Sequence, residues 1–357
     1  MTEEFTYKKS GVDIDKSDLV KKMKAEILRE SFETRKNKIG EVVTDFGAPA
    51  ALLDLFPLKN FKHPLLAFHT DNVGTKLIVA KMANKFDTIG IDCVAANVND
   101  IICLGAEPIS MVAYEAYYEL FEPEIMKQIT KGLLAGAKLA KISIPGGETA
   151  ILKDVLQTDA FDLAGTAVGV VDKEKMIHGN NLQDGDVIIG LESSGIHTNG
   201  LTLARKVFFD VAKFKVDDVL PDTEKTVGEF LLEPTKIYVD EILELINHGI
   251  IPKYVSHITG SGFLKVMRAP VNIRYEIESL PEIPKIFSAI QKHGKIPTEE
   301  MFKTFNMGIG MCVYLSKEDL DAASSILEKT KTGFHILGQC VSHNQKQVLI
   351  KQHNIIF

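Results

Sequence analysis

The run Pro64-Leu-Leu-Ala-Phe-His-Thr70, followed at once by Asp71-Asn-Val-Gly-Thr-Lys76, joins a strand to a polar turn. Its first half is apolar enough for a buried strand, and its second half ends that strand with turn residues. Residues 88–104, the next long apolar segment, contain small side chains and predict a buried helix. A strand that leads into a buried helix is typical of α/β and α+β proteins, so this stretch decides the fold class.

The rest of the chain continues this alternation of helices and strands. Apolar spacing predicts helices over residues 16–36, 123–140, 201–209, 279–295 and 317–329. Strands are predicted over residues 142–144, 161–171, 186–191 and 334–341, with a turn at 145–149 and a turn that feeds a strand within 305–315. The charged run at 172–175 separates two such halves. We therefore predict an α/β (α+β) protein with domains 1–171 and 172–357.

Composition excludes several classes of protein. The 357 residues include 41 Lys and Arg against 48 Asp and Glu, and the net charge of −7 argues against binding nucleic acid or an anionic membrane through overall charge. No apolar run approaches the roughly 18 residues of a membrane helix, and the polar start resembles no signal or transit peptide. We therefore expect a cytoplasmic protein. The four cysteines form no CxxC pair, which predicts free thiols.

Five polar, glycine-rich segments are the candidates for chemistry, and none of them is a GxxxxGK[ST] phosphate loop. The first contains His69, Asp71, Gly74, Thr75 and Lys76. A carboxylate fixed at a strand end can hold a metal ion, and a lysine can meet a phosphate as a point charge. The alternative is an ordinary turn with a capping Asp and a surface Lys.

The second segment lies on the predicted buried helix and contains Asp92, Asn99 and Asp100. The spacing of seven residues puts Asp92 and Asn99 on one helical face. A charged Asp in an apolar helix needs a partner. Oxygen ligands of this kind suit Mg²⁺, which keeps water and substrate phosphates in its shell. We favour a metal site here, and the alternative is an Asp that pairs with a basic residue.

The other three segments also combine glycines with polar side chains. Paired glycines at residues 146–147 allow a close backbone approach, and Glu148 is a candidate ligand of metal or substrate. In residues 193–200, N–H groups at a helix start can bind an anion, and His197 can bind phosphate or transfer a proton unless it is a structural histidine. Residues 257–262 and 306–310 fit the lining of a phosphate pocket, although either run alone is a weak signal.

In order and spacing, these segments resemble those of the phosphoribosylformylglycinamidine cyclo-ligases (aminoimidazole ribonucleotide synthetases). The matching runs are Tyr7-Lys8 with Gly11-Val-Asp-Ile-Asp15, Thr70-Asp71 with Val73-Gly-Thr-Lys-Leu77, Ile89-Gly-Ile-Asp92, Val98-Asn-Asp100 with Gly105-Ala-Glu-Pro108, Gly146-Gly-Glu-Thr-Ala150, Ser193-Ser-Gly195 with His197 and Asn199-Gly200, His257-Ile-Thr-Gly260, and Thr304-Phe-Asn-Met-Gly308 with Gly310-Met311. No single run is decisive, but eight in the same order argue against chance.

The resemblance implies a two-domain, PurM-like subunit. The N-terminal sheets of two copies would form the β-barrel of a homodimer, and the C-terminal α/β domain would complete the active-site cleft. It also implies ATP-dependent ring closure of formylglycinamidine ribonucleotide, a phosphorylated substrate, to 5-aminoimidazole ribonucleotide in purine biosynthesis. ADP and phosphate would be released and an iminophosphate would be the intermediate. The implied cofactors are ATP and Mg²⁺, with K⁺ as a further candidate.

The same resemblance implies roles for individual residues. The catalytic residues would be Lys76, Asp100 and His197, and the magnesium ligands Asp71, Asn99 and Asp100. Nucleotide contacts are implied for Lys8, Asp71, Gly74, Thr75, Lys76, Asp92, Asn99, Gly260 and Gly308, and residues 8–15 resemble a stretch that closes over the nucleotide. Substrate contacts are implied for Gly147, Glu148, Thr149, Ser193, Ser194, Gly195, His197 and Asn199.

The chain departs from the family pattern at Asn72 and Ser261, where the family has glycine, and within residues 151–160. If those glycines supply a positive φ, Asn72 can adopt it more easily than Ser261. Two alternatives stay open. One is another ATP-using relative, such as a thiamine-monophosphate kinase, and the other is a non-catalytic scaffold of the same fold. The presence of both Asp71 and Asp100 argues against the scaffold.

Overall fold

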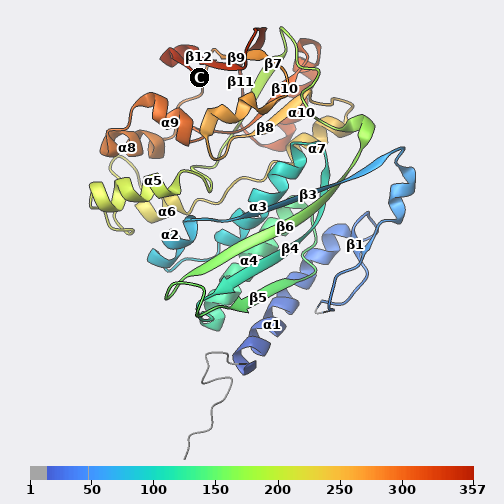
Figure 1. The fold of residues 1–357 in the computed structure, drawn as a ribbon, viewed down its shortest axis with the longest axis vertical. Helices are drawn as coiled ribbons and strands as arrows, with labels where there is room; N and C mark the ends of the chain where they lie inside the picture. Colours follow the sequence, from blue (N-terminus) through green and yellow to red (C-terminus); the bar gives the residue numbers. More distant parts are fainter. Residues whose placement is uncertain (1–13, 47) are drawn as a thin grey trace, which may run out of the picture.

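Two β-sheets organise the part of the chain that the computed structural model describes, residues 14–46 and 48–357 (Figure 1). Within these residues, one sheet has four strands in the order β3-β6-β4-β5, and the other has seven in the order β13-β12-β9-β11-β7-β10-β8. A short hairpin of β1 (Glu41–Val42) and β2 (Leu53–Asp54) accompanies the smaller sheet. The mixed α/β architecture expected from the sequence is confirmed.

The four-stranded sheet contains residues of three of the motifs, which are Thr70-Asp71, Gly105-Ala-Glu-Pro108 and Gly146-Gly-Glu-Thr-Ala150. Its strands are β3 (Pro64–Asn72), β6 (Phe161–Asp172), β4 (Glu107–Tyr117) and β5 (Gly147–Ile151), and only the β4–β5 pair is parallel. The register places Asp71, Gly165, Ala113 and Gly147 in one row across the sheet. At about 4.8 Å per strand, Asp71 and Gly147 lie roughly 14 Å apart, at opposite edges of the sheet.

Among the described residues, helices cover only one face of this sheet. α3 (Ile89–Ile102) and α4 (Pro123–Ala140) lie behind the strands, and α1 (Ile14–Leu28) lies beside them near β5 (Figure 1). α3 is buried along most of its length because it packs between the sheet and α4. The other face exposes large side chains, which are Leu66 (50% exposed), Phe68 (70%), Val112 (44%) and Tyr114 (42%).

The larger sheet forms most of the C-terminal half. Its strands are β7 (Val187–Glu192), β8 (Tyr254–His257), β9 (Ile273–Ile277), β10 (Ile309–Leu315), β11 (Phe334–Ser342), β12 (Gln347–Ile350) and β13 (Ile355–Ile356). The α-helices of this half are α5 (Leu201–Arg205), α6 (Val227–Leu231), α7 (Val239–Asn247), α8 (Lys285–Gly294), α9 (Thr298–Thr304) and α10 (Leu320–Leu327). One cluster of buried apolar side chains extends from α3 and α4 into β7 and β10. No helix in the described ranges is long and apolar enough to cross a membrane.

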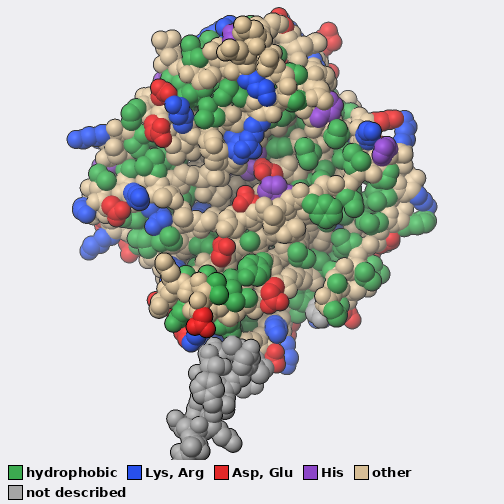
Figure 2. All heavy atoms as spheres, viewed as in Figure 1, with side chains coloured by type: hydrophobic (Ala, Val, Ile, Leu, Met, Phe, Trp, Pro, Cys, Tyr) green, Lys and Arg blue, Asp and Glu red, His purple; other side chains and the backbone are tan. Residues whose placement is uncertain are grey.

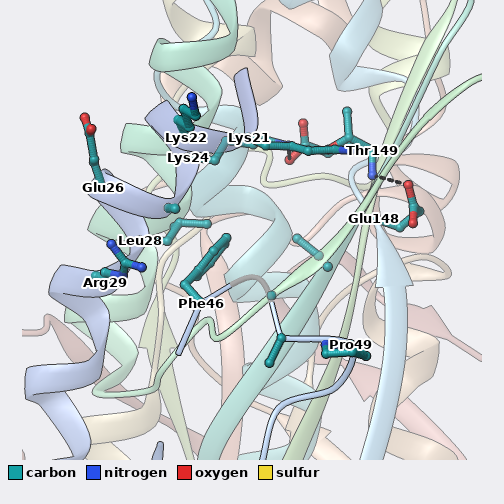
Figure 3. Close-up of a pocket in the computed structure, with 16 residues that line it drawn as sticks. Lys21, Lys22, Lys24, Glu26, Leu28, Arg29, Phe46, Pro49, Glu148 and Thr149 are labelled. Carbon is teal, nitrogen blue, oxygen red and sulfur yellow. Dashed lines mark hydrogen bonds and ion pairs between the residues drawn. The ribbon is translucent and has the colours of Figure 1, made fainter. Parts of the chain in front are cut away.

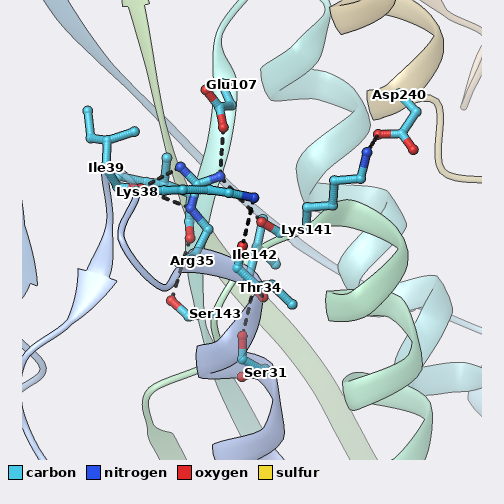
Figure 4. A network of polar contacts seen from close by, with 11 residues as sticks. Ser31, Thr34, Arg35, Lys38, Ile39, Glu107, Lys141, Ile142, Ser143 and Asp240 are labelled. Carbon is cyan, nitrogen blue, oxygen red and sulfur yellow. Dashed lines mark hydrogen bonds and ion pairs between the residues drawn. The ribbon is translucent and has the colours of Figure 1, made fainter. Parts of the chain in front are cut away.

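A buried arginine fastens the segment after α1 to the smaller sheet (Figure 4). Arg35 ends the 3₁₀ segment η1 (Arg29–Arg35), and its guanidinium donates to the carboxylate of Glu107 at 2.6 Å and to the carbonyl of Ile39. Nearby, Lys141 at the end of α4 pairs with Asp240 of α7 at 2.6 Å. Glu107 of the Gly-Ala-Glu-Pro run is thus a structural carboxylate. The ion pair between Lys141 and Asp240 joins the N-terminal half of the chain to the C-terminal half.

The structure corrects several predicted elements. Residues 147–149 belong to β5 instead of a turn, and residues 142–144 form no strand beyond the single bridge from Ser143 to Ser110. The helix predicted over residues 279–295 begins only at Lys285, because two prolines, at 281 and 284, disfavour helix before it. The α-helix predicted over residues 16–36 ends at Leu28 and continues as η1. The strand β4 was not predicted at all.

Candidate active site

The end of β3 brings two carboxylates and two histidines together. His69 and Asp71 lie on β3, Asp100 lies in the last turn of α3, and His257 ends β8. Asp100 is 2.8 Å from Nδ1 of His257 and 3.1 Å from Nε2 of His69. Asn97 holds the backbone of Asp71, accepting its N–H at 2.9 Å and donating to its carbonyl at 3.2 Å. The site therefore lies where α3 meets both sheets.

These contacts set the charge of the site. Burial alone would raise the pKa of Asp100, but hydrogen bonds from His257 and His69 outweigh it and lower that pKa. The hydrogen bond to Asp100 raises the pKa of His69, against the effect of partial burial. Asp100 is therefore ionised at neutral pH. In Figure 2, acidic, basic and histidine side chains gather near the middle of the face shown, where the surface is hollowed.

Asp71 and Asp100 are suitable donors for Mg²⁺. Both carboxylates act on the pKa of His69, so both lie near the same imidazole, and Asp71 is exposed. Mg²⁺ usually takes one or two protein carboxylates and completes its shell with water and substrate phosphates. The described residues contain no group of three or more His, Cys, Asp or Glu that could hold a metal ion by themselves. Two carboxylates together with a nucleotide's phosphates are therefore the set that fits.

Lys76 and Asp92 form a buried ion pair. Lys76, at the start of α2 (Lys76–Met82), lies 2.9 Å from Asp92 Oδ1, and both side chains are fully buried. Lys76 also donates to the carbonyl of Glu233 at 2.5 Å, and Thr235 donates to Asp92 through its N–H at 2.8 Å and its hydroxyl at 2.6 Å. In this structure neither side chain is exposed to a nucleotide, and the nucleotide contacts of Lys76 and Asp92 and the catalytic role of Lys76 stay predictions.

Asn99 is also occupied by the protein. Its Nδ2 donates to the carbonyl of Lys236 at 2.8 Å, and its Oδ1 accepts the N–H of Tyr238 at 2.9 Å. Both amide atoms are used and the side chain is buried in this structure, and the role of Asn99 as a magnesium and nucleotide ligand stays a prediction. Three side chains thus hold residues 233–238 against the N-terminal half. We call this set the α2–α3 clamp: Lys76, Asp92 and Asn99.

His197 is a buried histidine in a left-handed turn, with φ of 65°. Its Nε2 accepts the N–H of Ser194 at 3.3 Å, and its Nδ1 is buried with no hydrogen-bond partner among the described residues. Burial, with help from the charges of His257, Lys76 and Lys236, holds the pKa of His197 well below its usual range. The imidazole is therefore neutral at pH 7. Because Nε2 accepts a hydrogen bond, the proton of the neutral ring is on Nδ1, and this unpartnered N–H can donate to a substrate group.

Asn306 joins two of the glycine-rich runs. Its Oδ1 is 3.0 Å from the hydroxyl of Ser193 and accepts the N–H of Gly308 at 2.9 Å. Its Nδ2 donates to the carbonyl of Gly195 at 2.8 Å. The structure therefore brings Ser193, Gly195 and Gly308 together, although more than a hundred residues separate the two runs in the sequence.

Four other predicted residues lie on adjoining turns. A side chain at Gly260 would come within 3.0 Å of Asn199 Oδ1, so these two positions are in contact. Gly74 has a φ of 69°, which completes the turn after β3. The hydroxyl of Thr75 lies 3.2 Å from that of Thr202 in α5, and this contact places the β3 turn beside the turn that carries His197.

Gly147, Glu148 and Thr149 lie apart from these groups. They line a cavity of about 640 Å³ between α1 and β5, at the edge of the sheet opposite Asp71 (Figure 3). Thr149 accepts a hydrogen bond from Lys24 at 2.7 Å, and Glu148 accepts the N–H of Thr149 at 2.8 Å. In one copy of the chain, the predicted substrate residues therefore form two separate groups.

Sequence reasoning missed the charged floor of this cavity. Lys24 lies 2.5 Å from Glu115 Oε1, and Tyr117 donates to Glu115 Oε2 at 2.7 Å. Side chains two residues apart on a strand lie on the same face, so the sequence of β4 places Glu115 beside Tyr117 on the face that the helices cover. A carboxylate on that face was a sign of a buried charge. The predicted contact from Lys8 falls outside the described residues.

Comparison with known proteins defines the class first. The family model "AIR synthase related protein, N-terminal domain" matches residues 48–171, and the corresponding C-terminal model matches residues 183–351, so the chain is a two-domain protein of the AIR synthase related class. Phosphoribosylformylglycinamidine cyclo-ligase from Methanocaldococcus jannaschii is 47% identical over 94% of this chain and 92% of its own length. The protein of that name from Pyrococcus horikoshii is 45% identical, over 98% of this chain and 99% of its own. The chain belongs to the phosphoribosylformylglycinamidine cyclo-ligase family.

Solved structures with much lower identity share the fold. E. coli HypE, a hydrogenase maturation protein, matches with a TM-score of 0.67 and 16% identity over 96% of this chain and 95% of its own. Thiamine-monophosphate kinase from Stenotrophomonas maltophilia K279a matches with a TM-score of 0.64 and 17% identity over 90% and 95%. At these identities the likeness concerns the fold alone. The family resemblance stated from the motifs is confirmed by the sequence relatives.

Proposed function

We propose that this chain catalyses the ATP-dependent cyclisation of formylglycinamidine ribonucleotide to 5-aminoimidazole ribonucleotide, with release of ADP and phosphate. The reaction forms a C–N bond in purine biosynthesis, and the enzyme is a ligase. The observation that carries the proposal is the identity of 45–47% to proteins named cyclo-ligase, over more than nine-tenths of the chain. The thiamine-monophosphate kinase shares only the fold, so the kinase alternative has weaker support.

The chemistry needs activation of an amide oxygen, because that oxygen is a poor leaving group. Transfer of the γ-phosphoryl group of ATP to this oxygen gives an iminophosphate. The amidine nitrogen then attacks the activated carbon, the C–O bond breaks, and phosphate leaves with the oxygen. Positioning and neutralisation of charge are the main tasks of a protein in phosphoryl transfer.

We propose distinct tasks for the two sides of the site. Asp71 and Asp100 would hold Mg²⁺ beside the phosphates of ATP, and that ion would supply charge neutralisation. His197 is neutral and its Nε2 accepts the Ser194 N–H, so its unpartnered Nδ1 carries the ring proton, and this N–H is the group that would donate a hydrogen bond or a proton to the substrate. Use of ATP is supported by a HypE structure in complex with ATP, which shares this fold with a TM-score of 0.62.

The remaining predicted contacts are kept as proposals where the geometry allows them. We propose that the turn after β3 and the glycine-rich runs that Asn306 joins contact the nucleotide. The turn around His197 and the strand β5 would contact the ribonucleotide. The proposed nucleotide contacts are Gly74, Thr75, Gly260 and Gly308, and the proposed substrate contacts are Gly147, Glu148, Thr149, Ser193, Ser194, Gly195, His197 and Asn199. The α2–α3 clamp is left out of both sets.

We also propose a homodimer formed through the open face of the smaller sheet. Leu66, Phe68, Val112 and Tyr114 are large apolar side chains exposed on this face, and exposed apolar surfaces mark interaction sites. β3 and β5 are the outer strands of this sheet among the described residues, so each has a free edge for pairing. Two such sheets face to face would form the barrel that the resemblance implies.

Two coarser expectations go with this proposal. We place the domain boundary between residues 171 and 172, and the family models, which end at 171 and resume at 183, support that choice. We place the enzyme in the cytoplasm, because Cys93, Cys103, Cys312 and Cys340 are all free thiols, and free thiols persist in a reducing compartment.

The test is turnover by the purified protein with ATP, Mg²⁺ and formylglycinamidine ribonucleotide. ADP and the aminoimidazole product should appear in equal amounts. Asp71→Asn and Asp100→Asn should each lower kcat about a hundredfold or more, since each removes charge beside the phosphates. Asp87→Asn, which changes an exposed carboxylate elsewhere, is the matched control. A folded protein that releases ADP with thiamine monophosphate but forms no aminoimidazole product would replace the cyclo-ligase by the kinase.

A further inference from the structure

The cavity between α1 and β5 has the dimensions of a small-molecule site. Its volume of about 640 Å³ lies within the range of roughly 300–1,000 Å³ that is common for ligand pockets. α1 forms one wall, and β4, β5 and the segment around Phe46 and Pro49 form the others (Figure 3). A side chain added at Gly146 would meet no atom within 4 Å, so the backbone of the Gly-Gly run is open to an occupant.

A buried ammonium group forms the floor. The side chain of Lys24 is 9% exposed and that of Glu115 is 2% exposed, and burial of such charges is costly unless they are paired. Glu115 and Thr149 take two of the three N–H groups of Lys24. The third has no partner in the part of the chain that is described. It is therefore left for an occupant of the cavity, which Lys24 lines.

The rim adds exposed cations from α1 and from the first residue of η1. Lys21, Lys22 and Arg29 also line the cavity. Neither Lys22 nor Arg29 has an ion pair with any described residue. Together with Lys24 they bring four cations to a cavity that has three carboxylates, in a chain whose net charge is −7. An exposed basic stripe alone would be an ordinary solvated helix face, but here it continues into a buried, paired lysine.

We propose that this cavity binds the phosphate group of the ribonucleotide substrate. Lys24 would contact it from the floor, and Arg29 and Lys21 from the rim. The identity of the ligand rests on the proposed function. ATP is the other source of phosphate, but its phosphates belong beside Asp71 and Asp100, and Asp71 lies roughly 14 Å from Gly147 across the sheet. The phosphate that remains to be placed is that of the ribonucleotide.

The test compares rim, floor and control variants of the full chain. Arg29→Gln and Lys21→Gln should each raise KM for formylglycinamidine ribonucleotide about fivefold and leave KM for ATP and kcat unchanged. Lys24→Met should raise the same KM about tenfold or more, since a hydrogen bond to a charged group is lost. Lys131→Gln, on an exposed position of α4 outside the cavity, should change neither constant. Calorimetry with ribose 5-phosphate measures the phosphate site without turnover.

The outcomes separate this proposal from the proposed function. The rim variants keep the test valid even if Lys24→Met does not fold, because their side chains are exposed. Normal turnover with KM for the ribonucleotide unchanged in both rim variants overturns the site and leaves the cyclo-ligase function intact. A rise in KM for ATP instead assigns the cavity to the nucleotide and also overturns it. If turnover is absent but binding of ribose 5-phosphate still depends on Arg29, the phosphate site stands and the proposed reaction fails.

Discussion

Ser261 adopts a backbone conformation that favours glycine. Its φ is 81° and its ψ is 9°, at a position where the family pattern has glycine. A Cβ atom costs roughly 1–2 kcal/mol in this backbone region. Substitution by glycine removes that cost, but the greater conformational freedom of glycine in the unfolded chain cancels part of the gain in stability. Ser261→Gly should therefore raise the free energy of unfolding by about 1 kcal/mol, measured by urea denaturation.

The matched control is Ser261→Ala, which keeps the Cβ atom and should leave the urea midpoint within error of the original. Equal stabilisation by both substitutions would show that the hydroxyl, and not the backbone conformation, is responsible. Asn72 differs, because it lies within β3, has no positive φ, and uses its amide to reach Asp162 at 3.3 Å. The two departures from the family pattern therefore have separate structural consequences.

His69 should titrate above its ordinary pKa of about 6.5, because its hydrogen bond to Asp100 raises that pKa. NMR titration of the ring protons measures the value directly. In Asp100→Asn the carboxylate that raises the pKa most is gone and the opposing effect of partial burial remains, so the pKa of His69 should fall. An unchanged pKa in this variant would contradict the assigned pairing.

The same pair predicts a pH dependence of stability. The raised pKa of His69 contributes stability that is complete below about pH 6.5 and is lost as the pH rises through the folded-state pKa. The lowered pKa of Asp100 contributes stability above about pH 4, which is lost as the pH falls. The difference in urea midpoint between the original chain and Asp100→Asn should therefore be largest between about pH 4 and 6.5.

At the scale of elements, the α2–α3 clamp connects two helices of the N-terminal half to the segment before α7. Asp92→Asn would leave the Lys76 ammonium buried without its counter-charge. Breaking a buried pair in this way costs about 3–5 kcal/mol. We expect a loss of that size in the free energy of unfolding by urea denaturation.

The control for this prediction is Asp87→Asn, which removes an exposed ion pair with Lys85 and should change stability by less than about 0.5 kcal/mol. A small loss of stability in Asp92→Asn, combined with much weaker binding of ATP, would restore the nucleotide contact that the sequence motif suggested. The clamp would then be a ligand site that is closed in this conformation.

At the scale of the whole molecule, the proposed dimer depends on the open face of the smaller sheet. Phe68, on the outer strand β3, is 70% exposed on this face, and Phe68→Asp would place a charge in the interface that the proposal buries. Light scattering should give about twice the chain mass of 39.5 kDa for the original protein and a single chain mass for the variant.

Val211→Asp serves as the control for the dimer, because Val211 is also exposed but lies in the C-terminal half. It should leave the mass unchanged. A dimer that persists in Phe68→Asp, with an unchanged circular dichroism spectrum, would place the interface on another surface. The proposed reaction does not depend on this outcome, since its test uses turnover.

Local sequence was enough to predict the fold class, the family and most helices. α4 was predicted at its observed bounds, and the strands β3, β6 and β7 nearly so, because their signals lie in the spacing of apolar residues within each segment. The sequence predicts a turn where β5 begins, because the strand character of β5 comes from pairing with β4, which lies more than thirty residues earlier. β4 was itself not predicted.

The roles of individual polar residues needed the folded chain. Asp92, Asn99 and Lys76 have the chemistry of metal and phosphate ligands, and their motif suggested that role. Their partners lie near residue 235, and Thr235 is 143 positions after Asp92, so no local pattern could reveal that these side chains are already paired. Lys24 and Glu115, in turn, carry no motif, and only their meeting across α1 and β4 makes a charged cavity floor. Residue types and spacing determine which chemistry is available, whereas burial and long-range contacts decide which side chains remain free to use it.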